Sequence, residues 1–168
     1  LGGGMANTFL LAQGSDIGES LAEPDLVNQA RAIIAKAQEN NCTLILPQDY
    51  ATPDDAFKIM DIGITSIQTI QSALDHCQTV VWNGPVGVFE IEPFEKGSVA
   101  IAHYIAQRTQ KGKLVSVAGG GDTLACLNKA GVGDRLTYTS TAGGAFLEWL
   151  EGKNLAGITT LFAEGAKS

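Results

Sequence analysis

Apolar runs that end in glycine-rich turns, each followed by an amphipathic stretch, recur along this chain and constrain its fold more than any other feature. The clearest run, Leu114 to Ala118, leads directly into Gly119-Gly120-Gly121-Asp122-Thr123. A short and nearly continuous apolar run is typical of a strand buried on both faces. Strands that alternate with helices build a parallel sheet covered by helices. The pattern therefore predicts an α/β domain.

The expected elements follow from hydrophobic periodicity and from Gly and Pro punctuation. Helices are predicted at 5–13, 24–40, 94–110, 122–129 and 145–150, and a further helix starts at Ser66. Strands are predicted at 43–46, 79–82, 114–118 and 136–139, and 48–61 is an irregular connection. In the second helix the buried stripe should be Leu26, Ala30, Ile33, Ile34 and Ala37. The order indicates one Rossmann-like, three-layer αβα domain with a mostly parallel sheet.

Every glycine-rich turn lies at the carboxyl end of an expected strand. The turns span residues 2–4, 83–90, 119–123 and 140–144. In open α/β sheets the ligand sits beyond the carboxyl ends of the strands. A glycine turn that opens a helix exposes backbone N–H groups, and these amides and the helix dipole favour phosphate. The turns therefore predict a site for a nucleotide's phosphates.

Two interpretations of Asp122 remain open. The turn 119–123 is neither a P-loop nor G-x-G-x-x-G, since it lacks both spacings and contains no lysine. Asp122 could hold the Mg²⁺ that accompanies a nucleotide, because Mg²⁺ commonly takes one or two carboxylates plus phosphate oxygens. The same carboxylate could instead cap the helix that follows.

The other two turns also carry two interpretations each. In 82–90, Asn83 offers an amide at a strand end and Glu90 a carboxylate suited to ribose hydroxyls, unless the segment is an ordinary glycine-rich loop with a solvated Glu. In 140–145, the amides could face a phosphoryl group, or Ser140 or Thr141 could simply cap a helix.

Composition limits the classes of function. The 168 residues carry a net charge of −7 with scattered lysines and arginines, which argues against nucleic acid or an anionic membrane as partner. No apolar run approaches the ~20 residues of a membrane span. Three widely spaced cysteines (Cys42, Cys77, Cys126) predict neither a disulfide framework nor a zinc site and suit a cytoplasmic protein. His76 and His103 are interpreted as structural or solvated.

Four segments together resemble the C-terminal, nucleotide-binding half of phosphoglycerate kinases. They are GGGMANTFL at 2–10, WNGPVGVFE at 82–90, GGGDT at 119–123, and STAGGAFLE with LEGK at 140–153. The resemblance covers nearly the whole chain in order. It implies a glycolytic kinase that moves a phosphoryl group between 1,3-bisphosphoglycerate and Mg²⁺-bound ADP, giving 3-phosphoglycerate and ATP. It further implies a monomer in which an N-terminal domain holds the phosphoglycerate on a basic patch.

The resemblance also implies roles for individual residues. Gly3 and Gly4, together with Met60, would line the adenine pocket. The residues that would flank the nucleotide are Asn83, Pro85 and Val88, and Glu90 would hold the ribose. The phosphates would lie on Gly119, Gly120, Gly121, Asp122 and Thr123, with Asp122 on magnesium. The amides of Gly120 and Gly143 would be the catalytic groups that stabilise the phosphoryl group in transfer.

Three departures from the family pattern stand out. The chain contains neither the substrate domain nor the family's phosphate-binding lysine, so residues 1–168 are expected to form a partial nucleotide-binding domain that is inactive alone. The stretch between Asp49 and Asp61 is shorter than in the family, which bears on Met60. Ala142 stands where many members have glycine. The alternative to a kinase is a nucleotide-binding module without catalysis.

Overall fold

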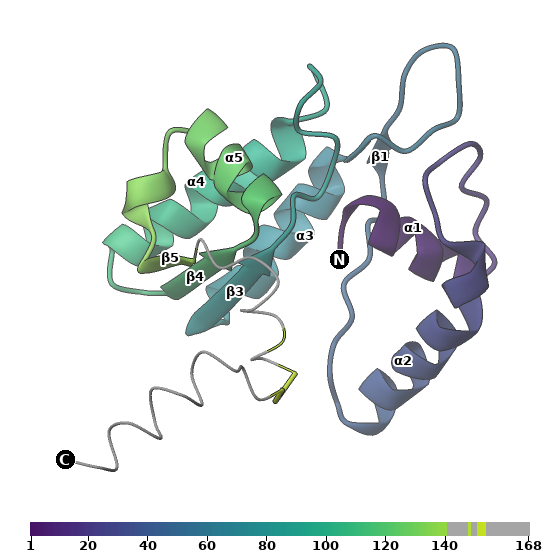
Figure 1. Cartoon of the computed structure of the whole chain (residues 1–168), viewed down its shortest axis with the longest axis horizontal. Helices are drawn as coiled ribbons and strands as arrows, with labels where there is room; N and C mark the ends of the chain where they lie inside the picture. Colours follow the sequence, from purple (N-terminus) through teal and green to yellow (C-terminus); the bar gives the residue numbers. More distant parts are fainter. Residues whose placement is uncertain (141–147, 149–150, 154–168) are drawn as a thin grey trace.

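The computed structural model describes residues 1–140, 148 and 151–153. Its helices, in chain order, are α1 (Gly3–Ala12), a 3₁₀ turn at Pro24–Leu26, α2 (Val27–Glu39), α3 (Ile64–Asp75), α4 (Lys96–Gln110), α5 (Gly121–Lys129) and a 3₁₀ turn at Gly133–Arg135. The strands are β1 (Tyr50–Ala51), β2 (Asp61–Ile62), β3 (Thr79–Asn83), β4 (Val115–Gly119) and β5 (Tyr138–Ser140). Figure 1 shows how these elements are arranged in space.

The main sheet is parallel, with the strand order β3-β4-β5. Its register places Asn83 beside Gly119, and Gly119 beside Ser140. The three carboxyl ends therefore lie at one edge, and all three lead into glycine-rich segments. A second, antiparallel pair joins β1 to β2. The α/β class and the parallel sheet are as predicted.

Helices pack on one face of the main sheet. Trp82 and Ala118 point into a core that α3, α4 and α5 complete, chiefly through Ile67, Leu74, Ile101, Ala102, Ile105, Ala106, Cys126 and Leu127. On the opposite face, Val81, Val115 and Tyr138 remain 44–59% exposed. The described residues thus show the sheet and one of the two helical layers that a three-layer arrangement contains.

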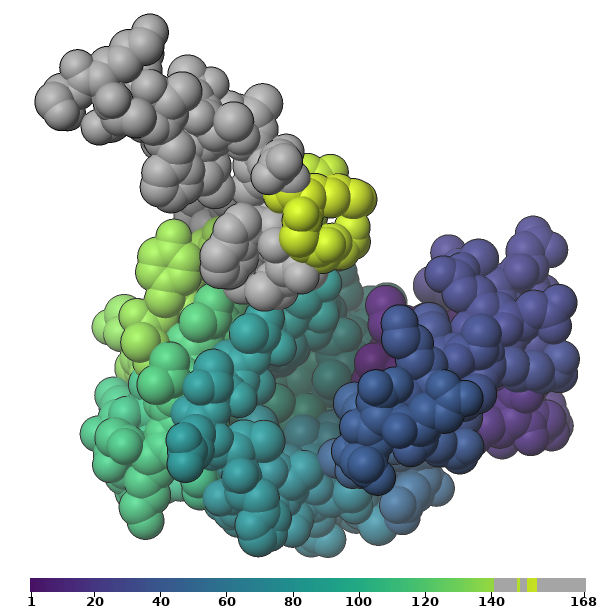
Figure 2. Space-filling model, turned by 90° about the horizontal axis from the view of Figure 1, so that it is seen from below, coloured from purple at the N-terminus to yellow at the C-terminus, as the bar shows by residue number. Residues whose placement is uncertain are grey.

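A smaller lobe stands beside this body, as Figures 1 and 2 show. It consists of α1 and α2, and its own core is formed by Phe9, Ala12 and Ala30. The helix α1 is short and mostly buried, as its apolar sequence predicts. Because α1 starts at Gly3, this lobe contributes one helix N-terminus to the edge where β3 ends.

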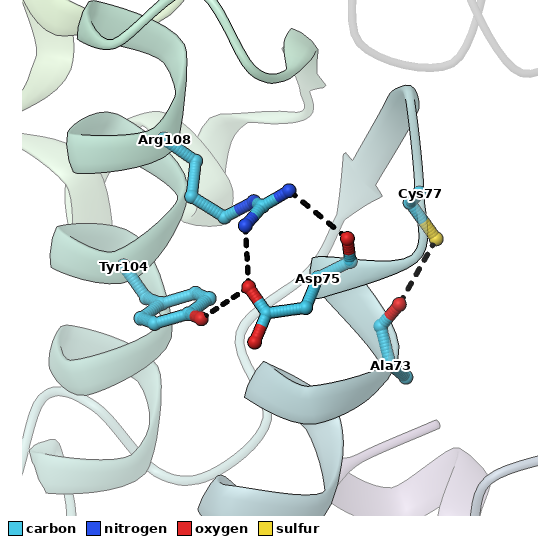
Figure 3. Close-up of polar contacts among 5 residues, drawn as sticks. All are labelled: Ala73, Asp75, Cys77, Tyr104 and Arg108. Carbon is cyan, nitrogen blue, oxygen red and sulfur yellow. Dashed lines mark hydrogen bonds and ion pairs between the residues drawn. The ribbon is translucent and has the colours of Figure 1, made fainter.

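A polar clamp joins the C-terminal end of α3 to α4 (Figure 3). Asp75 accepts a hydrogen bond from the Tyr104 hydroxyl at 2.6 Å, and Arg108 pairs with the same carboxylate. Arg108 also donates to the Asp75 backbone carbonyl at 3.2 Å. The clamp lies at the end of α3 that precedes β3, so it helps to fix β3 against the helical layer.

Three details of the fold differ from the prediction. Residues 43–46 form no strand, because no neighbouring strand within the described residues pairs with them. Leu26, in the 3₁₀ turn before α2, and Ile33 are 42% and 41% exposed, whereas Ala30 and Ala37 are buried, so the apolar stripe is narrower than expected. The connection 48–61 is irregular as predicted, except for the short strands at its ends. The helix expected at 145–150 lies outside the described residues.

No helix in the described part of the chain is long and apolar enough to cross a membrane. The three cysteines are free thiols, of which Cys126 is buried and the other two are exposed. Burial raises the pKa of the Cys126 thiol. His76 and His103 are both exposed, in agreement with their interpretation as solvated.

Candidate functional site

The loop of residues 84–90, which follows β3, is the centre of the candidate site. Five hydrogen bonds join it to four different parts of the chain: α1, the residue before β2, α4 and α5. Apart from Glu90, its residues are partly or fully buried. A loop that so many elements hold has a defined shape, as a preformed binding site requires.

The N-terminus of α1 packs against this loop. The amide of Gly3 donates to the carbonyl of Val86 at 2.9 Å. A Cβ at Gly2 would lie 2.6 Å from the Cα of Val86, so only glycine allows the two backbones to approach so closely. Gly3 has φ +59, a conformation that also favours glycine. The first glycine turn therefore meets the second one, as the sequence predicts.

The turn between β4 and α5 contacts the same loop from the other side. Thr123 is 1% exposed, and its hydroxyl accepts a hydrogen bond from the amide of Gly84 at 2.7 Å. Gly120 has φ +97 and lies next to Asn83, whose Oδ1 would be 3.1 Å from a Cβ at that position. Thr123 thus holds the loop through its side chain.

Asp122 is exposed in the first turn of α5. The residue at the N-cap position is Gly120, and no side chain caps this helix. Within the described residues, the Asp122 carboxylate takes part in no hydrogen bond or ion pair, which disfavours the capping interpretation. The amides of Gly121 and Asp122 belong to exposed residues and have no acceptor within α5, so they are available to an anion, whereas Thr123 is buried.

Met60 lies directly beside the loop, since its carbonyl accepts a hydrogen bond from the amide of Val88 at 2.7 Å. Pro85 faces α1, where its carbonyl is 3.6 Å from a Cβ placed on Gly3. Glu90 is exposed at the end of the loop. Gly143 and the turn at 141–144 lie outside the described residues, and β5 ends at the buried Ser140 just before them.

Sequence reasoning missed three side chains that hold the loop in place. The Ser98 hydroxyl in α4 accepts a hydrogen bond from the amide of Val86 at 2.9 Å. The Lys129 ammonium at the end of α5 donates to the carbonyl of Phe89 at 2.8 Å. Asp61 packs beneath Gly87. Each of these side chains is 12 or more residues away in sequence from the loop residue that it contacts. The sequence offers one indication of such a role, which is that the acid Asp61 stands between the apolar residues Met60 and Ile62.

A cavity of about 570 Å³ adjoins the site, between the start of α1, α3 and the free edge of β3. Gly3, Gly4, Asn83 and Pro85 border it, whereas Met60, Glu90 and Asp122 do not. The remaining lining is mostly apolar, with Ile70, Leu74 and Val80 among it. Such a lining does not suit phosphates.

The described residues contain no cluster of three or more His, Cys, Asp or Glu side chains that could hold a metal ion by themselves. A single carboxylate, Asp122, lies next to the amides of the α5 turn. This donor set fits an Mg²⁺ ion whose other ligands are phosphate oxygens and water, which is how Mg²⁺ usually binds with nucleotides.

Comparison with known proteins identifies relatives along nearly the whole chain. The family model described as phosphoglycerate kinase matches residues 1–153. Curated phosphoglycerate kinases from Methylorubrum extorquens (strain PA1) and Bartonella bacilliformis are 54% and 50% identical, each over 98% of this chain. The chain spans about half the length of these relatives, 46% and 45% respectively. The first alignment runs over 183 positions, more than the chain's 168 residues, so it leaves gaps in this chain.

Two solved structures share the fold. The phosphoglycerate kinase from Coxiella burnetii superposes with a TM-score of 0.82 at 44% identity, over 90% of this chain and 43% of that protein. The phosphoglycerate kinase from Pyrococcus horikoshii OT3 gives a TM-score of 0.72 at 30% identity, over 92% of this chain and 42% of that protein.

Proposed function

This chain belongs to the phosphoglycerate kinase family, and from that premise we propose that it forms the nucleotide-binding half of an enzyme that transfers a phosphoryl group between 1,3-bisphosphoglycerate and Mg²⁺-bound ADP. The products of the forward reaction are 3-phosphoglycerate and ATP. The family match over residues 1–153 supports this proposal, as does the position of the predicted nucleotide residues around one loop.

The observation that carries the proposal is the set of contacts around residues 84–90. Two glycine turns that are more than a hundred residues apart in sequence, at the start of α1 and at the start of α5, both bind this loop through hydrogen bonds. The arrangement places two helix N-termini next to one strand end. Such N-termini favour anions, and a nucleotide brings two or three phosphates.

In the proposed binding mode, the base lies against Gly3, Gly4 and Met60, while Asn83, Pro85 and Val88 flank the nucleoside. Glu90, exposed at the end of the loop, accepts hydrogen bonds from the ribose hydroxyls. The phosphates lie on the amides of the α5 turn, residues 119–123.

The proposed reaction needs positioning and charge stabilisation more than covalent work by the protein. The bond between phosphorus and the acyl oxygen breaks, and a terminal oxygen of ADP forms the new bond to phosphorus. The exposed amides of the α5 turn, with Gly120 at its N-cap, donate to the oxygens of the group in transfer. We assign a matching role to the amide of Gly143.

Magnesium fits this scheme through Asp122. Asp122 would hold the ion, which would supply positive charge to the phosphates. Asp122 is exposed and unengaged within the described residues, so its carboxylate is available as a ligand without breaking an existing contact.

We further propose that residues 1–168 bind nucleotide but do not catalyse transfer alone. Among the described residues, the one cation that contacts the 84–90 loop is Lys129, and its ammonium is already bound to the carbonyl of Phe89. A net charge of −7 adds no attraction for an acyl phosphate. Basic groups from the rest of the parent protein would supply it. A cytoplasmic location, a monomeric parent, and the absence of nucleic-acid or membrane partners belong to the same proposal.

The substitution Asp122→Asn tests the metal assignment. We expect the affinity for Mg·ADP to fall about tenfold or more, while the affinity for metal-free ADP changes little, because only the metal ligand is lost. Isothermal titration calorimetry with and without Mg²⁺ measures both. Asp134→Asn removes the same charge at an exposed position in the 3₁₀ turn Gly133–Arg135 and serves as the control. An equal loss of both affinities, or no loss in either, would rule out Asp122 as the magnesium ligand.

A further inference from the structure

Asp61 is a buried carboxylate that the proposed chemistry does not use. It is 1% exposed and is the first residue of β2. An acid that is fully buried normally has a counter-charge or a full set of hydrogen bonds, because burial penalises the ionised form. Within the described residues, Asp61 has no ion-pair partner. Its carboxylate instead accepts two backbone hydrogen bonds, from Gly97 to Oδ2 at 2.6 Å and from Ile62 to Oδ1 at 2.9 Å.

Two glycines make room for this carboxylate. A Cβ at Gly87 would lie 2.7 Å from the Asp61 Cγ, and a Cβ at Gly97 would lie 3.0 Å from the same atom. Neither glycine has a positive φ, so lack of space for a side chain, and not backbone conformation, explains why both residues are glycine. Gly87 is in the middle of the 84–90 loop, and Gly97 is in the first turn of α4. Asp61 therefore fills the space between the loop and the helix.

The same three elements are joined by further hydrogen bonds around Asp61. The Met60 carbonyl accepts from the amide of Val88, and the Ser98 hydroxyl accepts from the amide of Val86. The loop is thus bound through Val88 to the residue before β2 and through Val86 to α4. Asp61 ties β2 to α4 through Gly97 and so sets the distance between these two attachment points.

The position of Asp61 at the start of α4 also gives its charge a role. Glu95 is the N-cap residue of α4, but its side chain does not cap the helix. The Gly97 amide, in the first turn, has no acceptor within the helix. The Asp61 carboxylate supplies that acceptor and an anion at the positive end of the helix dipole. Protonation would weaken this bond and would add a hydrogen atom in a space that two glycines already limit.

Charged and titratable groups from several elements surround Asp61. Burial raises the pKa of Asp61 to about 6; the two amides oppose the shift, and the charge of Glu95 adds to it. One oxygen of Glu95 is itself buried without a partner among the described residues. From α5, the Cys126 thiol interacts electrostatically with Asp61, with Lys129 and with Glu90 at the end of the loop.

We propose that ionised Asp61 is a positioning residue, which holds loop 84–90 in the shape that binds nucleotide, and that its protonation releases the loop and weakens nucleotide binding. This inference rests on the proposed function and deepens it. Asp61 touches no nucleotide in this scheme. It acts through Gly87 and through the α4 turn at Gly97.

The variant Asp61→Asn tests the proposal, since its shape is nearly unchanged and only one of its two terminal groups can accept a hydrogen bond. Calorimetric titration of the whole chain with Mg·ADP at pH 7.5 should show affinity reduced about tenfold, which corresponds to ~1.4 kcal/mol. The urea midpoint of the variant at the same pH should not fall, because a buried charge has been removed. A structural role alone would lower both together. Asp134→Asn, with the same change in charge at an exposed site, should match the wild type in both measurements.

The pH profile separates this proposal from the proposed function. The wild-type affinity relative to that of Asp61→Asn should rise between pH 5 and 7, a comparison that cancels the titration of ADP itself. If the wild type binds no Mg·ADP, the proposed function fails. If the wild type binds and the variant binds equally well at all pH values, the function stands and the role of Asp61 is refuted.

A measurement on the wild type alone guards against a variant that does not fold. In a ¹⁵N NMR titration, the amides of Val86, Val88 and Gly97 should shift together with a midpoint near pH 6, the pKa of Asp61. Amide shifts for the loop that stay constant while the Gly97 amide titrates would show that the charge of Asp61 does not reach the loop and would overturn the proposal.

Discussion

Replacing Gly87 by alanine should destabilise the folded chain by crowding the carboxylate beneath the loop. The added Cβ would lie 2.7 Å from the Asp61 Cγ and 2.8 Å from its Cα. The Cα belongs to the backbone of β2, which cannot rotate away as a flexible side chain would. Either the loop must lift off β2, or β2 must move and strain its bond to the Gly97 amide.

The magnitude follows from this overlap. An extra methyl group in a well-packed site typically costs about 1–3 kcal/mol. Since the clash involves backbone and a hydrogen-bonded carboxylate, we expect the upper part of that range, about 2–3 kcal/mol. For a chain of this size, each kcal/mol lowers the midpoint of thermal unfolding by about 2–4 °C, so the expected fall is roughly 4–12 °C. Lifting the loop also separates Val88 from Met60, so the affinity for Mg·ADP should fall as well.

Urea denaturation at pH 7.5 measures the stability change, and calorimetry measures nucleotide affinity. Gly121→Ala is the stability control, because a Cβ there meets nothing within 4 Å and the residue starts α5 with an ordinary φ. Alanine should leave the stability unchanged or raise it by up to about 1 kcal/mol at this position. If Gly87→Ala is as stable as Gly121→Ala, the packing of Asp61 against the loop is not as described, and the argument built on it fails.

The remaining predictions concern individual contacts of the same loop. Thr123→Val leaves the Gly84 amide without its acceptor and should lower the free energy of unfolding, measured in urea, by about 1–3 kcal/mol. Thr123→Ser keeps the hydroxyl and should lower this free energy less. Equal losses in the two variants would contradict the role of the hydroxyl. Lys129→Met removes the ammonium bound to the Phe89 carbonyl and should weaken Mg·ADP binding severalfold with a stability loss of only about 1 kcal/mol, so an unchanged affinity would dismiss this contact. Burial raises the pKa of Asp61 from 3.8 to about 6, so the stability that this group contributes is complete below pH 3.8 and is lost as the pH rises through 6. In urea, the free energy of unfolding of Asp61→Asn should therefore exceed that of the wild type increasingly between pH 4 and 7, by about 3 kcal/mol at most. Parallel curves for the two proteins would refute the shift.

The strands that bury apolar residues and end in glycine could be predicted from sequence within a residue or two. β3 and β4 were recognisable because Val80 and Trp82, or Leu114 and Ala118, follow a local pattern that the core then satisfies. Residues 43–46 show the limit of this reasoning. Their apolar pattern resembles that of β3, but a strand also needs a neighbouring strand for its backbone hydrogen bonds. Among the described residues no strand pairs with this segment, although the amine of Leu1 donates to the carbonyl of Ile45.

For the candidate site, the glycine turns were predictable because their effect is local. Gly120 has φ +97, and Gly2 lies very close to the backbone of Val86. Both conditions favour glycine, so the sequence itself indicates these positions. The side chains that hold the loop were not predictable in this way. Ser98 and Lys129 lie in helices at positions where a serine or a lysine is ordinary, and only the fold brings them to Val86 and Phe89.

Thr123 illustrates the same distinction within a single motif. Its position in the turn after β4 predicts a residue near phosphates. Its hydroxyl, however, is buried and bound to the amide of Gly84. The motif alone predicts contact with phosphates, whereas the structure shows that this side chain positions the loop. Asp122, one residue earlier, is the exposed member of the pair and the one suited to a metal.

The most direct test of the account is a calorimetric titration of this chain with ADP, in the presence and in the absence of Mg²⁺. We expect saturable binding at one site, with higher affinity when Mg²⁺ is present, because the loop, the α1 and α5 N-termini and Asp122 lie together in the folded chain. A chain that is folded by circular dichroism but gives only heats of dilution under both conditions would contradict the claim that these residues form a nucleotide site.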